Sequence, residues 1–189
     1  MRKATPIAAA LMFSAMAGPL SAQQAITTTH AGVESDLAGT LEGTLAQGTP
    51  AVLIVPGSGP TDRDGNSPLG IAAQTYKLLA EALAQHGIAS VRIDKRGMFG
   101  SAAAVPDPND VTVDDYVADI ESWADTISRE SGGQCVWLLG HSEGGLLAMA
   151  AAASDPSRYC GLLLVASVGV NAAEVIRTQL AANPANAPI

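Results

Sequence analysis

Apolar and polar residues alternate in blocks along this chain, and the blocks predict strands and helices in turn. Four short runs rich in apolar residues have the length of buried strands, at 51–55, 88–93, 135–139 and 162–166. Three longer segments have helical periodicity, at 71–86, 113–129 and 143–153. Continuously apolar strands that alternate with helices are typical of a parallel sheet covered on both faces. The pattern therefore predicts an α/β fold with a mostly parallel sheet.

The regions before and after this core have weaker patterns. We expect short strands at 33–37 and 41–45, joined as a hairpin around Ala38-Gly39. Residues 172–180 have the composition of one more helix. In the helix at 71–86, with Gly87 as its cap, four residues are expected to face inward: Ile71, Leu78, Leu79 and Leu83.

The first 22 residues have the pattern of an export signal. Arg2 and Lys3 precede an apolar stretch at 7–17 that is too short to span a bilayer, and Leu20-Ser21-Ala22 forms an acceptable cleavage site. An ordinary hydrophobic N-terminal helix is the alternative, although Gly18-Pro19 would interrupt it. We expect an exported protein, periplasmic or secreted, with no membrane span after removal of the signal.

Composition and charge narrow the class of partner. The 189 residues suggest one domain, and 48% of them are hydrophobic, which is enough to bury a core. The formal net charge is −8 at pH 7, and loss of Arg2 and Lys3 would make it two units more negative. An acidic chain of this kind argues against nucleic acid as a partner. The sequence contains no cluster of metal-ligand residues, and we expect neither a metal nor a cofactor.

Two cysteines, Cys135 and Cys160, each precede a serine by seven residues, Ser142 and Ser167. If the strands that carry them are parallel neighbours, the two cysteines lie side by side at the same end of the sheet. Export would permit a disulfide between them. Two small buried apolar residues are the alternative.

The residues at 140–144, Gly-His-Ser-Glu-Gly, have the form G-x-S-x-G of a nucleophile elbow. A predicted strand precedes them and a predicted helix follows them. A sharp turn between strand and helix would expose the hydroxyl of Ser142 to a substrate. The backbone N–H of Glu143, at the start of the helix, would then be a natural donor to an oxyanion.

A second donor is expected from the loop Pro56-Gly57-Ser58-Gly59-Pro60, which follows the strand at 51–55. Its glycines allow the N–H group of Ser58 or Gly59 to face inward, and Gly57 and Gly59 are candidate substrate-binding residues. A plain Gly/Pro turn is the alternative. A dinucleotide-binding loop is excluded, because Gly57-Ser58-Gly59 would need glycine at position 62, which is Asp.

Charged residues in the same loops have a structural and a functional interpretation. Asp62, Arg63, Asp64 and Asn66 are expected to hold the first loop by local hydrogen bonds, and substrate contact is the alternative. Asp94 and Arg96 are expected to form an internal brace at the mouth of the sheet. A substrate carboxylate bound by Arg96 is the less favoured interpretation.

Three segments together carry a resemblance to a known family: 56–66 (PGSGPTDRDGN), 94–101 (DKRGMFGS) and 140–145 (GHSEGG). In order and spacing, over about residues 35–170, the chain resembles an α/β-hydrolase of the esterase and serine-aminopeptidase-like branch. Family members commonly have a His-Gly pair where Pro56-Gly57 stands, and Gly97 and Gly100 are one residue farther apart than in the family pattern. The resemblance implies Ser142 as nucleophile, with the N–H groups of Ser58 and Glu143 as oxyanion donors and a small-molecule ester or amide as substrate.

A serine nucleophile needs a base, and in this fold the acid and the histidine follow the serine along the chain. The three histidines are His30, His86 and His141, and none follows Ser142. The later acids Asp155 and Glu174 lack a histidine partner. We therefore expect a fold truncated before its last strands, with a signal at 1–22, a partial core at 23–170 and the start of a lid at 171–189. A non-catalytic binding protein, or a truncated pseudo-enzyme, is the alternative.

Overall fold

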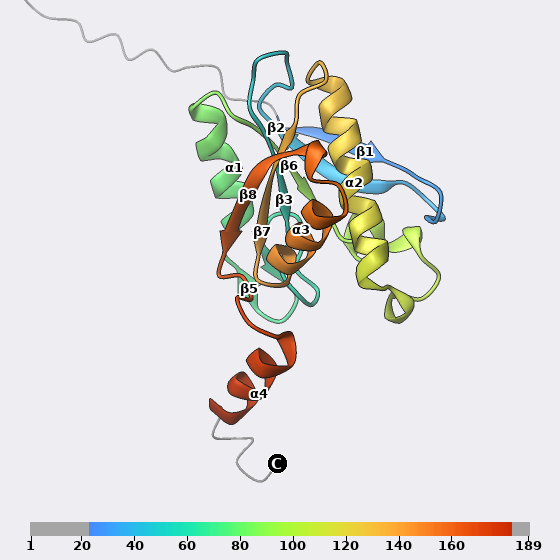
Figure 1. The fold of residues 1–189 in the computed structure, drawn as a ribbon, viewed down its shortest axis with the longest axis vertical. Helices are drawn as coiled ribbons and strands as arrows, with labels where there is room; N and C mark the ends of the chain where they lie inside the picture. The colour runs from blue at the N-terminus through green and yellow to red at the C-terminus, as the bar shows by residue number, and fades with distance from the viewer. Residues whose placement is uncertain (1–22, 183–189) are drawn as a thin grey trace, which may run out of the picture.

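The computed structural model describes residues 23–182, and a six-stranded sheet forms their centre (Figure 1). The strand order across the sheet is β1-β2-β6-β3-β7-β8. Strands β6, β3, β7 and β8 run parallel to one another, whereas β1 and β2 are antiparallel to their neighbours. The strands are β1 Gln24–Thr28, β2 Leu37–Glu42, β3 Ala51–Val55, β6 Ala89–Ile93, β7 Val136–His141 and β8 Tyr159–Val165.

Helices cover both faces of this sheet, as the sequence predicts. On one face lies α1, and on the other lie α2 and α3 (Figure 1). The α-helices are α1 Thr75–Gln85, α2 Val113–Glu130, α3 Glu143–Ser154 and α4 Ala172–Ala182. Short 3₁₀ helices, η1 Phe99–Ala104, η2 Pro108–Asp110 and η3 Pro156–Arg158, and a small hairpin of β4 Asn66–Ser67 and β5 Ile71–Ala72 complete the described elements.

The central strand β3 shows why its sequence is continuously apolar. Val52 and Ile54 pack in a cluster with Tyr76 and Ala80 of α1. The alternate residues Leu53 and Val55 pack in the cluster on the other face, with Trp123 and Leu147. Successive strand residues point to opposite faces, and here both faces are covered, so every residue of β3 is buried.

The expected N-terminal hairpin is wrong. Ala38-Gly39 lies inside one strand, β2, whose antiparallel partner is β1. Gly39 makes room for the side chain of Trp123 and does not form a turn, because a Cβ on it would lie 2.8 Å from the ring of Trp123. A glycine that makes room for a distant aromatic ring looks like a turn glycine in the sequence.

The expected inward face of the first helix is partly wrong. The helix begins at Thr75, and Ile71 belongs to β5. Leu79 and Leu83 pack against the core as expected, but Leu78 is 56% exposed. The inward row is completed by Tyr76 and Ala80, which the sequence interpretation did not select. His86 caps the helix, and Gly87 follows with φ 73°, a conformation that favours glycine.

The remaining predicted elements agree with the structure to within a few residues. Helix α2 begins with a capping box, in which Thr112 and Asp115 exchange side-chain and backbone hydrogen bonds. Helix α4 extends away from the sheet (Figure 1). None of the helices within residues 23–182 combines the length and the apolar character that a membrane span requires. The predicted export signal at 1–22 lies outside the described residues.

Cys135 and Cys160 form a disulfide in the structure, with their Cα atoms 5.1 Å apart. Cys135 directly precedes β7 and Cys160 is the second residue of β8, its parallel neighbour. The bridge therefore ties the two strands together where both begin, at the edge of the sheet opposite Ser142.

Helix α3 packs unusually close to the end of β3. A Cβ on Gly144 would overlap the carbonyl oxygen of Val55 and lie 2.5 Å from that of Pro56. Both are backbone atoms, which cannot move aside without shifting the strand. Position 144 therefore requires glycine for the close approach of two backbones.

We predict that Gly144→Ala lowers the free energy of unfolding by about 3 kcal/mol or more, since overpacking against backbone is poorly relieved. Gly169→Ala is the matched control, because a Cβ there would meet nothing within 4 Å. Urea unfolding followed by circular dichroism measures both variants. Equal stability of Gly144→Ala and wild type would contradict the packing argument.

We also predict that the unreduced protein contains no thiol that iodoacetamide can alkylate, as measured by intact mass spectrometry. Replacing both cysteines by serine should cost about 2–4 kcal/mol of stability, because the bridge restricts the unfolded chain. Two alkylated cysteines in the folded, unreduced protein would contradict the pairing.

Candidate active site

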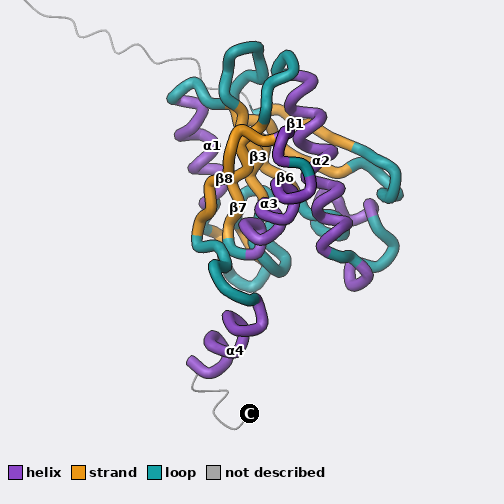
Figure 2. The backbone as a smooth tube through the Cα atoms, in the orientation of Figure 1, coloured by secondary structure: helices purple, strands orange, loops and turns teal. Residues whose placement is uncertain are grey.

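The loops that follow the parallel strands gather at one edge of the sheet, the lower edge in Figure 2. Ser142 lies at this edge between β7 and α3, with φ 54° and ψ −119°. A positive φ is strained for a residue other than glycine and is held only when the surroundings fix it. The N–H group of Ser142 donates to the carbonyl of Val165 at 2.9 Å, and its carbonyl accepts from the N–H of Gly145 at 3.1 Å. The structure therefore has the predicted strand–turn–helix geometry.

Close backbone packing fixes this turn. A Cβ on Gly140 would overlap the backbone of Gly144 and Gly145. Glu143 is the first residue of α3, and an N–H group at that position has no acceptor within the helix. Its N–H group is therefore free to bind an anion beside Ser142, and the positive end of the helix dipole lies there as well.

The loop after β3 touches the nucleophile candidate. A Cβ on Gly57 would lie 3.3 Å from the Cβ of Ser142 and 3.2 Å from Nδ1 of His141. The N–H group of Gly57 donates to the hydroxyl of Tyr76 at 3.3 Å, so it is already engaged. The next N–H group along the loop belongs to Ser58, which lines the same cavity as Ser142. Gly59 has φ 71° and does not line that cavity.

Tyr76 connects the two halves of the site. Its hydroxyl, besides accepting from Gly57, lies 2.7 Å from Nδ1 of His141, and the two rings pack edge to face with centroids 5.7 Å apart. Burial raises the pKa of this phenol, and the hydrogen bond from Gly57 opposes the rise. Tyr76 was missed by the sequence interpretation. Its spacing from Leu79, Ala80 and Leu83 on α1 was the signal that could have found it.

A cavity of about 320 Å³ opens beside Ser142. Its walls come from the loop after β3, from α1 and β5, and from the ends of β7 and β8. None of the residues that line it is an Asp, Glu, Lys or Arg. The lining residues are Gly57, Ser58, Thr61, Gly65, Ile71, Thr75, Tyr76, Leu79, Leu139, His141, Ser142 and Val165. The space beside the serine is therefore mostly apolar.

The polar residues of the first loop hold the loop itself, as expected. Asp62 accepts hydrogen bonds from the N–H groups of Asp64, at 2.9 Å, and Asn66, at 2.8 Å. Asp64 lies 2.5 Å from the guanidinium of Arg92, which is completely buried in β6. These contacts tie the loop to the sheet.

Three consecutive charged residues after β6 are buried, and each binds a different part of the molecule. Asp94 binds the guanidinium of Arg63 at 2.5 Å. Lys95 binds Glu143, with Nζ 2.7 Å from Oε2. Arg96 binds Asp119, and the hydrogen bond to Asp119 raises the Arg96 pKa despite burial. The expected brace of Asp94 and Arg96 is therefore present, although the two residues brace other elements and not each other.

The histidines and later acids that the sequence interpretation set aside as triad members also lie away from Ser142 in the structure, except His141. The ring of His30 lies 2.8 Å from Asp119, and His86 caps α1. Asp155 accepts hydrogen bonds from Ser157 and Arg158, which lower its pKa, and Glu174 is exposed in the first turn of α4. Within residues 23–182, no histidine follows Ser142 in the chain.

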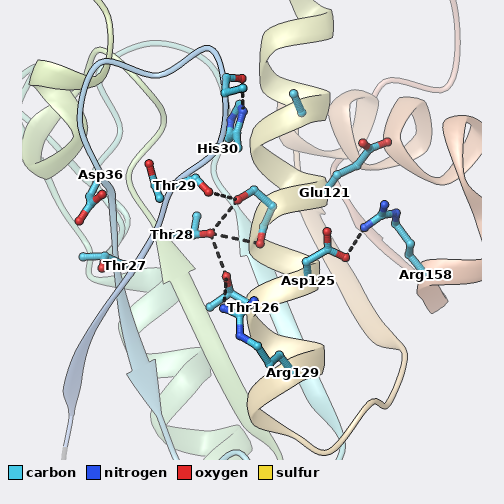
Figure 3. A pocket seen from close by; sticks show the side chains of 13 residues that line it. Thr27, Thr28, Thr29, His30, Asp36, Glu121, Asp125, Thr126, Arg129 and Arg158 are labelled. Atoms are coloured by element: carbon cyan, nitrogen blue, oxygen red, sulfur yellow. Dashed lines mark hydrogen bonds and ion pairs between the residues drawn. The ribbon is translucent and has the colours of Figure 1, made fainter.

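A larger cavity, of about 640 Å³, lies between β1 and α2 (Figure 3). None of its lining residues belongs to the loops that follow β3, β6, β7 or β8. Its polar groups bind one another: the hydroxyl of Thr28 lies 2.8 Å from that of Thr126, and Asp125 pairs with Arg158. We therefore place the candidate site at the smaller cavity. Between residues 23 and 182, no group of three or more His, Cys, Asp or Glu side chains is placed to hold a metal ion.

Comparison with solved structures supports the fold. The chain is similar to a dienelactone hydrolase from Anabaena variabilis, with a TM-score of 0.61, 20% identity and coverage of 78% of this chain and 64% of that chain. It is similar to a carboxyl esterase from Bacillus coagulans, with a TM-score of 0.64, 16% identity and coverage of 85% of this chain and 49% of that chain. It is also similar to a proline iminopeptidase-related protein from Thermus thermophilus, with a TM-score of 0.55, 23% identity and coverage of 77% of this chain and 45% of that chain.

The chain spans between about half and two thirds of the length of these proteins. A comparison with curated protein sequences found no match. The model of the family described as serine aminopeptidase, S33, matches residues 69–185, which is more than half of the chain. The chain therefore belongs to the serine aminopeptidase S33 family of α/β-hydrolases.

Proposed function

We propose that this protein hydrolyses a carboxylic ester or amide through an acyl-enzyme formed on Ser142. The observation that carries the proposal is the strained turn that presents Ser142 between β7 and α3, beside the N–H group of Glu143. A free N–H group at a helix N-terminus, next to a hydroxyl that lines a cavity, is the arrangement that acyl transfer needs.

In the proposed reaction, the oxygen of Ser142 attacks the carbonyl carbon while a base takes its proton. The electron pair of the C=O bond moves to the oxygen, and the N–H groups of Glu143 and Ser58 bind the resulting oxyanion. Collapse of this intermediate breaks the ester or amide bond, and the leaving alcohol or amine receives the proton. Water then releases the acyl group by the same steps.

Ser58 is the donor that we assign on the loop after β3. The N–H group of Gly57 is engaged by Tyr76, which leaves the next N–H group for the substrate. Tyr76 also binds His141, the residue before the nucleophile, so one buried hydroxyl holds the loop and the elbow together. Gly57 contributes by its lack of a side chain, which brings the loop against Ser142.

We propose further that the base and its acid partner are supplied by polypeptide outside this sequence, and that the 189-residue chain alone is poorly active. His30 lies in the Asp119 cluster and His86 caps α1. His141 directly precedes Ser142 in the chain, and neighbouring residues project in different directions. The same observations favour the second candidate function, a non-catalytic binding protein or truncated pseudo-enzyme that keeps the fold. Export to the periplasm or medium remains part of the proposal, and the Cys135–Cys160 disulfide suits such a compartment.

The cavity supports an ester with an uncharged acyl group. A peptidase that recognises a free N-terminus needs an anionic group for the ammonium, and no charged side chain lines this cavity. The carboxylates of the surrounding loops are engaged, Asp64 by Arg92, Asp94 by Arg63 and Glu143 by Lys95. Ile71, Leu79 and Val165 offer instead an apolar wall for an alkyl or aryl chain.

A fluorophosphonate probe tests the nucleophile. We expect labelling of Ser142 in the protein completed by its missing segment, and weak labelling or none in the 189-residue chain, as followed by intact mass spectrometry. Ser142→Ala should abolish any label. Strong labelling of the short chain that depends on Ser142 would contradict the proposed absence of the base.

Alkylboronic acids test the acyl preference at equilibrium, without a base. We expect hexylboronic acid to bind more tightly than methylboronic acid, by roughly fourfold for each methylene that the cavity buries. An ammonium at the end of the chain should remove this gain. Leu79→Asn should reduce the dependence on chain length, whereas Leu78→Asn, on the exposed side of the same helix, should not. Tighter binding of the ammonium compound would instead favour an aminopeptidase.

A further inference from the structure

Glu143 is an unexpected residue at the position that it occupies. Its N–H group, at the N-terminus of α3, is the proposed oxyanion donor. Its carboxylate lies on the same residue, within one side-chain length of that N–H group. A negative charge there cancels the positive end of the helix dipole and repels an oxyanion. Taken alone, Glu143 would oppose the reaction that its backbone promotes.

Lys95 is placed to remove this conflict. Its Nζ lies 2.7 Å from Oε2 of Glu143, and the residue is 4% exposed. The ammonium also lies 5.3 Å from the centroid of the Tyr116 ring. Burial, and next the charge of Glu143, raise the pKa of the Tyr116 phenol, so this neighbour stays neutral and adds no second negative charge.

The charged residues on either side of Lys95 in the chain bind other partners. Asp94 is bound by Arg63, and Arg96 is bound by Asp119 and Asp115. Lys95 therefore faces Glu143 as its ion-pair partner. A buried ion pair is weak evidence of a contribution to stability, because desolvation offsets the attraction. Stability alone therefore does not explain why Lys95 is buried. The position of the Glu143 carboxylate, next to the proposed oxyanion donor, does explain it.

We propose that Lys95 is a positioning residue, which neutralises and holds the Glu143 carboxylate so that the N–H group of the same residue can stabilise an anion on the substrate. This inference rests on the proposed role of Ser142. It assigns to the buried lysine an electrostatic effect on the transition state, separate from any effect on folding. Arginine in its place would retain the charge, whereas methionine would retain only the apolar stem.

Phenylboronic acid measures this effect without a general base. The oxygen of Ser142 adds to boron, the serine proton leaves to solvent, and the tetrahedral boronate carries one negative charge, as the oxyanion does. Its dissociation constant, from calorimetry with ¹¹B NMR to identify the adduct, is compared among Lys95→Met, Glu143→Gln, the double variant and Lys95→Arg. Binding of benzamide, which is neutral, is the control for cavity shape, and urea unfolding is the control for folding.

We expect Lys95→Met to weaken boronate binding by about tenfold, since the carboxylate of Glu143 then lies without its cation beside the anionic adduct. Glu143→Gln should bind at least as tightly as wild type. The double variant should recover to within about threefold of wild type, and Lys95→Arg should stay close to it. Benzamide binding should be the same in all variants.

A purely structural lysine gives a different result: the double variant would bind as weakly as Lys95→Met, or benzamide would weaken in parallel. Either outcome overturns the inference, as does unchanged boronate binding by Lys95→Met. Failure of the proposed function is a separate result. In that case the wild-type protein forms no tetrahedral adduct that is lost in Ser142→Ala, and the inference falls with it.

Discussion

Buried charges at the carboxyl end of β6 set the arrangement of everything around Ser142. Asp94, Lys95 and Arg96 follow one another in the chain, and each is less than 5% exposed. A buried charge without a partner is too costly to tolerate, so each residue must draw an opposite charge from another element. Their partners are on the loop after β3, on α3 and on α2. One tripeptide thus fixes the positions of three elements that surround the candidate site.

The nucleophile turn depends on this framework. Ser142 holds a positive φ, which costs free energy unless the surroundings over-determine it. Glycines allow the backbone of α3 to touch that of β3, and the Lys95–Glu143 pair holds the first residue of the helix. Tyr76 fixes the opposite side through Gly57 and His141. The proposed oxyanion donors, the N–H groups of Ser58 and Glu143, therefore lie on elements that are held in place before any substrate binds, as electrostatic catalysis would require.

Local patterns predicted the layers of the fold and the elbow, because both depend on short-range chemistry. Apolar runs located β3, β6, β7 and β8, and the G-x-S-x-G pattern located Ser142. Pairings between distant segments were not predictable in this way. The β2–β6 ladder, the Gly39–Trp123 contact and the Lys95–Glu143 pair each join residues that are far apart in the chain. Tyr76 was missed because leucines dominated the apparent helix face, although Leu78 points to solvent.

The pairing of charges also bears on the base that the proposed reaction requires. Around Ser142, the carboxylates of Asp64, Asp94 and Glu143 are each bound by a cation. Asp62 accepts hydrogen bonds from its own loop. A histidine that reached Ser142 would have to share a carboxylate that already binds a cation or the N–H groups of its own loop. An imidazole that acts as a base is oriented by an acceptor on its second nitrogen, so a base that arrives with its own carboxylate would be oriented better than one that shares. For the proposed reaction, a histidine with its own carboxylate is therefore a better base than a single histidine added near Ser142.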